Sequence, residues 1–161
     1  MKRLLFTMAS GPDSGVAERG NVEETEMLDG WLLATSAGHH ATGNRNLITD
    51  FVAECGVDFV YAADGTQMQV LGCGKVVTRN VVLAGVLLVA GLTRNLVSVA
   101  QLAELDYTVA FGRAACLVSS PEDGTVVGRA HARDDGLYVV DNLRIPIPRS
   151  PRRRIDQHAS T

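Results

Sequence analysis

Short apolar segments, separated by turn signals at roughly even spacing, restrict the fold of this chain more than any other feature of its sequence. They lie at residues 31–35, 57–61, 81–89, 107–111, 116–118, 125–129 and 137–140. Several such segments in succession, bounded by glycine- and aspartate-rich turns, are typical of strands in a closed sheet. The sequence therefore predicts a mainly β fold, in the form of a small closed β-barrel.

One turn predicts a β-hairpin in detail. Asp64-Gly65 follows an apolar segment and precedes alternating apolar and polar residues. Asp-Gly favours a type I′ turn, which needs positive φ at both central residues. Gly72 and Gly74 interrupt the second strand, which predicts either a bulge or a close approach of another backbone.

The apolar period changes from two to that of a helix in a single place. Apolar residues fall at i, i+3, i+4 and i+7, namely at Leu96, Val99, Ala100 and Ala103. Asn95 precedes them and is a suitable N-cap. We predict one amphipathic helix near residues 95–105.

Composition and charge exclude several classes of protein. The 161 residues suit one domain, and a net charge of −3 makes nucleic acid an unlikely partner. The longest apolar run, at 81–92, is shorter than the roughly 20 residues that span a bilayer, so we expect no membrane partner. Three cysteines are too few for a disulfide scaffold, and their odd number favours a reducing compartment. No two of them are close enough in sequence for a zinc site, and we expect no metal or other cofactor.

Charge and apolar content divide the chain into three parts. Residues 1–30 hold few large apolar side chains and several glycines, which predicts a flexible N-terminal arm. Residues 31–143 carry the strand patterns and are the predicted folded domain. Residues 144–161 hold five arginines among prolines and predict an extended tail, which could be a nuclear signal. We expect a cytoplasmic or nuclear protein, with organelle targeting by the first residues as a weaker alternative.

The adjacent histidines His39 and His40 lie in a glycine-containing loop and could in principle bind a metal ion. Neighbouring loop side chains rarely converge on one ion, and no third ligand is close in sequence. Packing or hydrogen bonding in the loop is therefore the favoured interpretation. Cys73, between Gly72 and Gly74, is likewise interpreted as a packed thiol rather than a nucleophile.

Four segments, in order along residues 31–141, resemble a known family. They are Trp31-Leu-Leu-Ala-Thr-Ser-Ala-Gly-His-His-Ala-Thr-Gly-Asn44, Ala63-Asp-Gly-Thr66 with Val70-Leu-Gly-Cys-Gly74, Gly91-Leu-Thr-Arg-Asn-Leu-Val-Ser-Val-Ala-Gln-Leu102, and Gly136-Leu-Tyr-Val-Val-Asp141. This pattern is similar to the protease region of copia-type retrotransposon Pol polyproteins. The resemblance implies a retropepsin-like β-barrel, and in that family each subunit of a dimer supplies one catalytic aspartate.

The catalytic triplet of that family is replaced in this chain. Ala34 stands where the resemblance places the aspartate, Thr35 where it places the serine, and Ser36 where it places the glycine. Aspartic proteases need two carboxylates that share a proton, and a homodimer of this chain would have neither. We therefore expect no catalytic residues and no peptidase activity.

The resemblance and the lost triplet together suggest a free-standing, retrotransposon-derived domain taken over by its host, with a plant as the first expectation. Such a domain could act as a non-catalytic module that binds another protein, a peptide or a related chain, and could form a homodimer. The candidate binding residues are His39, His40, Asp64, Gly65 and Thr66. The alternatives are a structural remnant without selected activity, or an enzyme of another class that uses His39 or His40.

Overall fold

The computed structural model describes residues 5–6 and 30–148. Most of the predicted N-terminal arm, and the predicted tail beyond Pro148, lie outside the described residues. Within them, no helix is long and apolar enough to cross a membrane.

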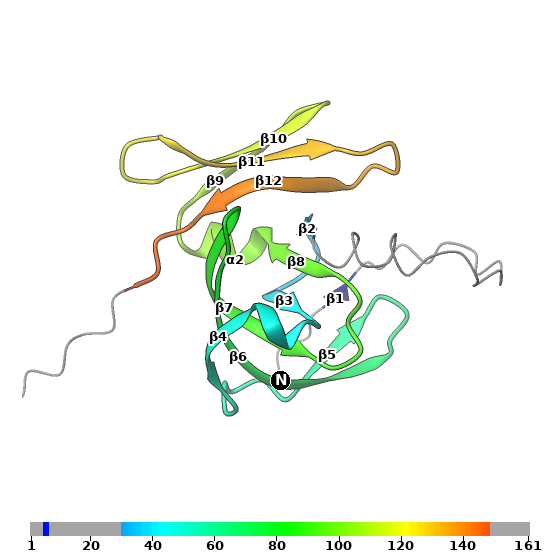
Figure 1. Cartoon of the computed structure of the whole chain (residues 1–161). Helices are drawn as coiled ribbons and strands as arrows, with labels where there is room; N and C mark the ends of the chain where they lie inside the picture. Colours follow the sequence, from blue (N-terminus) through cyan, green and yellow to red (C-terminus); the bar gives the residue numbers. More distant parts are fainter. Residues whose placement is uncertain (1–4, 7–29, 149–161) are drawn as a thin grey trace, which may run out of the picture.

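The described chain is mainly β, with one short α-helix, as the sequence predicts (Figure 1). The elements are β1 (Leu5–Phe6), β2 (Trp31–Ala34), β3 (His40–Thr42), the 3₁₀ turn η1 (Arg45–Leu47), β4 (Ile48–Val52), β5 (Phe59–Ala62), β6 (Gln67–Val77), β7 (Val81–Val89), β8 (Asn95–Ser98), α2 (Val99–Glu104), β9 (Thr108–Phe111), β10 (Ala115–Ser119), β11 (Val126–Ala132) and β12 (Tyr138–Arg144). The strand predicted at 81–89 coincides with β7. The segments predicted near 107–111, 116–118, 125–129 and 137–140 became β9 to β12.

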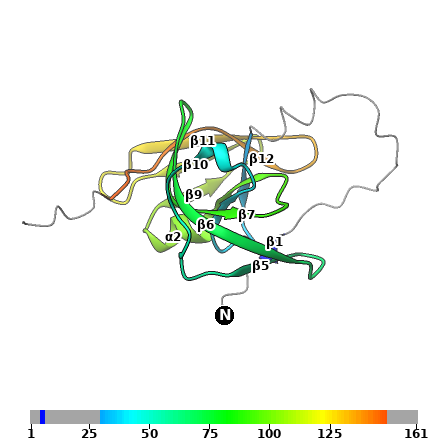
Figure 2. The same ribbon diagram turned by 60° about the horizontal axis from the view of Figure 1, so that its bottom comes forward.

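The strands form one mixed sheet in the order β1-β5-β6-β7-β3-β8-β2-β12-β11-β10-β9, with β4 added beside β6. Strands β9 to β12 make an antiparallel layer above the remaining strands, which curl into a partial ring (Figure 1). Turning the molecule shows β6 and β7 running together along this ring (Figure 2). Closure into a β-barrel stays a prediction.

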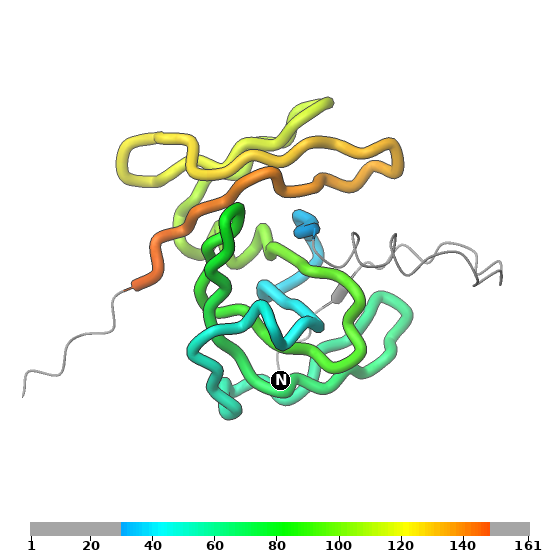
Figure 3. The backbone as a smooth tube through the Cα atoms, viewed as in Figure 1, coloured from blue at the N-terminus to red at the C-terminus, as the bar shows by residue number. Residues whose placement is uncertain are grey.

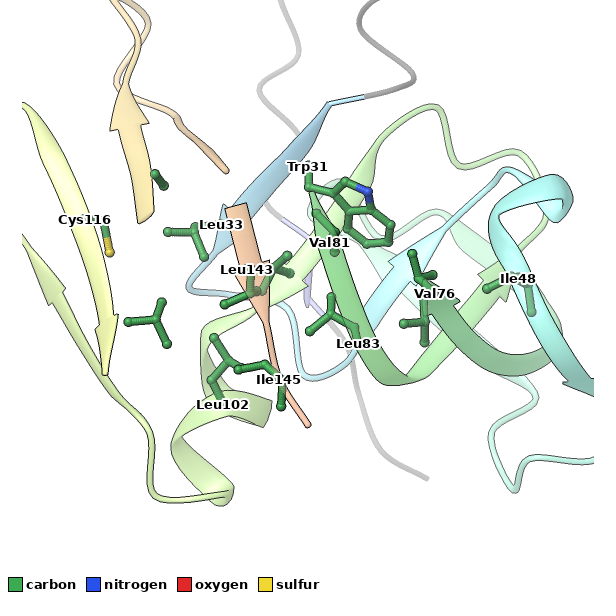
Figure 4. Packing of buried hydrophobic residues seen from close by; sticks show 14 of the residues in the cluster. Trp31, Leu33, Ile48, Val76, Val81, Leu83, Leu102, Cys116, Leu143 and Ile145 are labelled. Carbon is green, nitrogen blue, oxygen red and sulfur yellow. The ribbon is translucent and has the colours of Figure 1, made fainter. Parts of the chain in front are cut away.

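The end of β12 joins the upper layer to the ring. It leaves the layer and passes the β6–β7 hairpin (Figure 3), where Arg144 pairs with Val82 of β7. Ile145, one residue further, is 5% exposed. Figure 4 shows Leu143 and Ile145 in the same cluster as Cys116 of the upper layer and Leu83 of β7. This shared core holds the two parts of the sheet together.

The β5–β6 hairpin is confirmed, but its predicted type I′ turn is wrong. Gly65 has a φ of 86°, whereas Asp64 is not among the non-glycine residues with positive φ. The amide of Gly65 donates to the carbonyl of Ala62 at 2.9 Å, and the amide of Ala62 donates to the carbonyl of Thr66 at 2.9 Å. These bonds describe a three-residue loop in which only the glycine needs left-handed backbone.

Gly72 and Gly74 serve both of the predicted purposes. The register of β6 against β7 shifts around each of them. A Cβ at Gly74 would lie 2.5 Å from the carbonyl oxygen of Thr49, and one at Gly72 would lie 2.5 Å from that of Val52. Both contacts come from β4, a strand that the sequence pattern did not reveal.

The helix begins later than predicted. Asn95 is the first residue of β8, which pairs in parallel with β2, and the helix starts after Ser98. The hydroxyl of Ser98 accepts the amide of Gln101, so Ser98 is the N-cap. Tertiary pairing with β2 overrides the local helical period of this segment.

Candidate functional site

The three residues that replace the catalytic triplet lie at the end of β2. Ala34 is partly buried and pairs with Ser98 of β8. Thr35, which is exposed, and Ser36, which is partly buried, follow in the bend after the strand. A methyl group and two hydroxyls provide no acid or base for activating water at this position.

His40 is buried in β3, with 2% of its surface exposed. Its Nδ1 accepts the backbone amide of Ser98 at 2.9 Å, and its own amide donates to Oε1 of Gln101 at 2.8 Å. Burial, assisted by the charge of His39, lowers the pKa of His40 from 6.5 to about 3. The imidazole is therefore neutral at physiological pH, and with Nδ1 accepting, its proton is on Nε2.

Further hydrogen bonds join the segment around His40 to β8. The hydroxyl of Thr42 donates to Oδ1 of Asn95 at 2.6 Å, and Nδ2 of Asn95 donates to the carbonyl of Gly30 at 3.3 Å. The hydroxyl of Ser98 donates to the carbonyl of Ala37. These motif residues are hydrogen-bonded to one another inside the molecule, so they build the scaffold. The sequence pattern marked Asn95 as a helix N-cap, whereas Thr42 and Ser98 stood out only through the resemblance.

Gly43 belongs to the same scaffold. A Cβ at this position would lie 1.8 Å from the carbonyl oxygen of Leu92, so only glycine fits there. The close approach fixes the end of β3 against the turn that precedes β8.

The turn residues Asp64, Gly65 and Thr66 lie apart from the histidines. They are exposed at the tip of the β5–β6 hairpin, and β6 and β7 separate β5 from β3 in the sheet. The amide of Thr66 donates to Oδ1 of Asp64 at 2.9 Å. Hydrogen bonds from the side chain and backbone of Thr66 lower the pKa of Asp64. These contacts stabilise the turn, and the fold does not bring the five candidate binding residues into one site.

The described residues include no group of three or more histidine, cysteine, aspartate or glutamate side chains that could hold a metal ion. Cys73 packs beside Cys55 against one of the two apolar clusters. Burial and the neighbouring thiol of Cys55 raise the pKa of Cys73 to about 11, so the thiol is protonated and a poor nucleophile.

An open pocket of about 400 Å³ lies next to His40. Its walls come from β7, from α2 and the residues after it, from the turn between β10 and β11, and from the chain after β12. The lining residues are His40, Leu83, Ala84, Gly85, Gln101, Leu105, Tyr107, Ser120, Pro121, Glu122, Ile145, Pro146 and Pro148. Of the five candidate binding residues, the pocket includes His40 alone. No sequence signal marks the remaining lining residues of the pocket, because they come together only when distant segments fold.

One of three comparisons with known proteins finds a similarity, and it covers part of this chain. Residues 31–107 match the family described as Pol polyprotein, beta-barrel domain. No curated protein and no solved structure matches the chain significantly. The matched residues run from β2 to the residue before β9, so they include the histidine loop, the β5–β6 hairpin and the scaffold of β8. The Pol polyprotein part of the resemblance is confirmed over this range, and the protease part stays a prediction.

Proposed function

We propose that this chain, whose residues 31–107 match the Pol polyprotein beta-barrel domain family, acts as a non-catalytic module that binds an extended peptide segment of another protein. Within this proposal the domain is a retropepsin-like relic that its host has retained for binding. The observation that carries the proposal is the open pocket of about 400 Å³, a volume in the range of small-ligand sites.

The lining of the pocket indicates the chemistry of its ligand. Leu105 offers an exposed apolar side chain, Tyr107 adds an aromatic ring, and the almost fully buried Leu83 and Ile145 complete the apolar wall. The side chain of Gln101 is already used, since it accepts from His40 and donates to the carbonyl of Gly85 at 3.3 Å. The walls therefore favour an apolar ligand side chain, anchored by burial more than by charge.

The replaced triplet supports the non-catalytic half of the proposal. Ala34 gives a homodimer no carboxylate pair, and the buried neutral His40 already uses its Nδ1 to accept a backbone amide. The purified chain should therefore show no peptidase activity in mildly acidic buffer against a generic peptide library. Turnover that pepstatin abolishes would contradict this half of the proposal alone.

Peptide selection tests the binding half. A random peptide library is panned against the full chain, and the selected peptides are measured on two variants. Ala84→Phe puts a large ring into the pocket from β7, whereas Ala63→Phe puts the same ring on the exposed β5–β6 turn. We expect at least tenfold weaker binding to Ala84→Phe, corresponding to about 1.4 kcal/mol, and unchanged binding to Ala63→Phe.

Two outcomes would reject the pocket as the binding site. One is that panning enriches no peptide. The other is that the enriched peptides bind Ala84→Phe as tightly as the unchanged chain. Matching unfolding curves for the two variants are needed before the affinities are compared.

A further inference from the structure

One border of the sheet is open to pairing. β9 ends the order of the sheet and pairs with β10 alone among the described strands. Thr108, Ala110 and Phe111 are exposed, and Val109 is partly buried. Natural proteins usually block such edges with lysine, proline or a bulge, because unpaired backbone groups recruit other strands. The sequence Thr-Val-Ala-Phe has no charge and no proline, and its pairing with β10 is regular.

β4 shows how this same chain blocks another border strand. Asp50, in the middle of β4, has a φ of 53°, and the register of β4 against β6 shifts between Thr49 and Val52. The Asp50 carboxylate also lies 3.3 Å from Nζ of Lys75. A charge and an irregular backbone therefore interrupt β4, whereas β9 has neither.

The hydrogen bonds of the β9–β10 hairpin show which backbone groups of β9 point outward. The amide of Gly112 donates to the carbonyl of Ala115 at 2.8 Å, so this is a hydrogen-bonded pair. Hydrogen-bonded and non-hydrogen-bonded pairs alternate along an antiparallel ladder. Ala110 thus bonds toward β10, and the amides and carbonyls of Val109 and Phe111 point to the free edge.

We propose that a second copy of this chain pairs with the free edge of β9, antiparallel, about a two-fold axis at Ala110. In this register Val109 faces the partner's Phe111, and Phe111 faces the partner's Val109. Both members of each pair have outward amides and carbonyls, so four backbone hydrogen bonds form. Ala110 faces the partner's Ala110 in a close non-hydrogen-bonded pair, where small side chains fit.

Side chains and flanking charges favour a second copy over an unrelated strand. The register joins an aromatic to a β-branched side chain twice, a combination that stabilises antiparallel pairs. The ring of Phe111 is held by Tyr138, with ring centroids 5.1 Å apart. Asp106 and Arg113 flank the strand, are exposed and take part in no ion pair of the described residues. The two-fold axis brings Asp106 near the partner's Arg113, and Arg113 near the partner's Asp106.

Four residues per strand make a small interface, so the dimer is weak and depends on concentration. Light scattering after gel filtration, over a dilution series of the full chain, measures it. The mass should rise from 17.2 kDa toward twice that value at high micromolar concentration. Ala110→Lys and Ala110→Asp place like charges opposite each other at the axis, so each variant alone should stay at 17.2 kDa.

Mixing gives the decisive measurement. An equimolar mixture of Ala110→Lys and Ala110→Asp places opposite charges at the axis, and we expect the doubled mass to return. Ala63→Lys, on an exposed turn remote in the sheet order, should dimerise like the unchanged chain. The proposal is overturned if the unchanged chain stays monomeric, if Ala110→Lys dimerises normally, or if the mixture stays monomeric. If the free edge of β9 paired only with unrelated peptides, the unchanged chain would stay monomeric. The Ala84→Phe experiment reports on the pocket independently, so either proposal can fail alone.

Discussion

The imidazole of His40 illustrates at the scale of one residue how burial selects a protonation state. Its Nδ1 can accept the amide of Ser98 only while it carries no proton. Protonation would place a charge in the interior beside His39 and would break this bond. The neutral ring is thus a condition for the contact between β3 and the start of α2.

The stability of the fold should consequently depend on His40 in acid. The unfolded chain binds a proton at this residue near pH 6.5, and the folded chain binds it only near pH 3. The contribution of neutral His40 to the free energy of unfolding is complete above pH 6.5. It falls as the pH drops from 6.5 toward 3, by at most about 1.4 kcal/mol per pH unit.

Urea unfolding at about pH 7 and about pH 5 measures this dependence. His40→Asn keeps an acceptor for the Ser98 amide but does not titrate, so its stability should fall less between the two conditions. If the free energy of unfolding falls as much for His40→Asn as for the unchanged chain, groups other than His40 cause the acid sensitivity.

At the scale of elements, the junction of β8 and α2 depends on one serine. Ser98 is fully buried; its hydroxyl accepts the amide of Gln101 at 3.0 Å and donates to the carbonyl of Ala37. It therefore caps a six-residue helix that could not persist by itself and ties that helix to the bend after β2. β8 and α2 meet at Ser98 because this residue ends the strand and its side chain caps the helix.

Ser98→Ala should lower the free energy of unfolding by about 2 kcal/mol, from the lost cap and the unpaired carbonyl. Ser120→Ala is the matched control. Its hydroxyl accepts the amide of Glu122 at 3.3 Å in an exposed turn, so its loss should cost less than about 0.5 kcal/mol. Thermal or urea unfolding of both variants compares them, and equal losses would show that Ser98 is not a structural link.

At the scale of the whole molecule, the residues around the end of β12 connect the upper layer to the ring. Leu143 is 1% exposed, and the amide of Ile145 donates to the carbonyl of Val82 at 3.0 Å. The predicted folded domain ends at residue 143, yet these contacts continue past it. A segment that leaves the last strand contributes to stability when its side chains are buried and its backbone is hydrogen-bonded.

Two truncations test this connection. A chain ending at Pro148 should unfold like the full chain, because it keeps the pairing of Arg144 and the burial of Ile145. A chain ending at Leu143 should lose about 2 kcal/mol or more, since burying one isoleucine contributes about 1.5–3 kcal/mol. Equal stability of the two would mean that the upper layer holds to the ring without this segment.

The sequence by itself determined the strands whose patterns are local. The run at 81–89 is β-branched and apolar because β7 is central, and its side chains enter both apolar clusters. Gly65 and Gly72 marked a turn and a bulge because backbone geometry there depends on the residue itself. In these cases the physical cause lies within a few residues of the signal, so a sequence pattern can report it.

Tertiary structure alone decided the rest. Asn95 to Ser98 became a strand because β2, more than 60 residues earlier, offers a ladder to pair with. The pocket gathers residues from His40 to Pro148, and none of them is marked as a wall by its neighbours in sequence. The neutral state of His40 follows from its burial against Ser98. A local pattern reports which face of a segment is buried, but not which distant segment buries it, and the candidate site depends on that second choice.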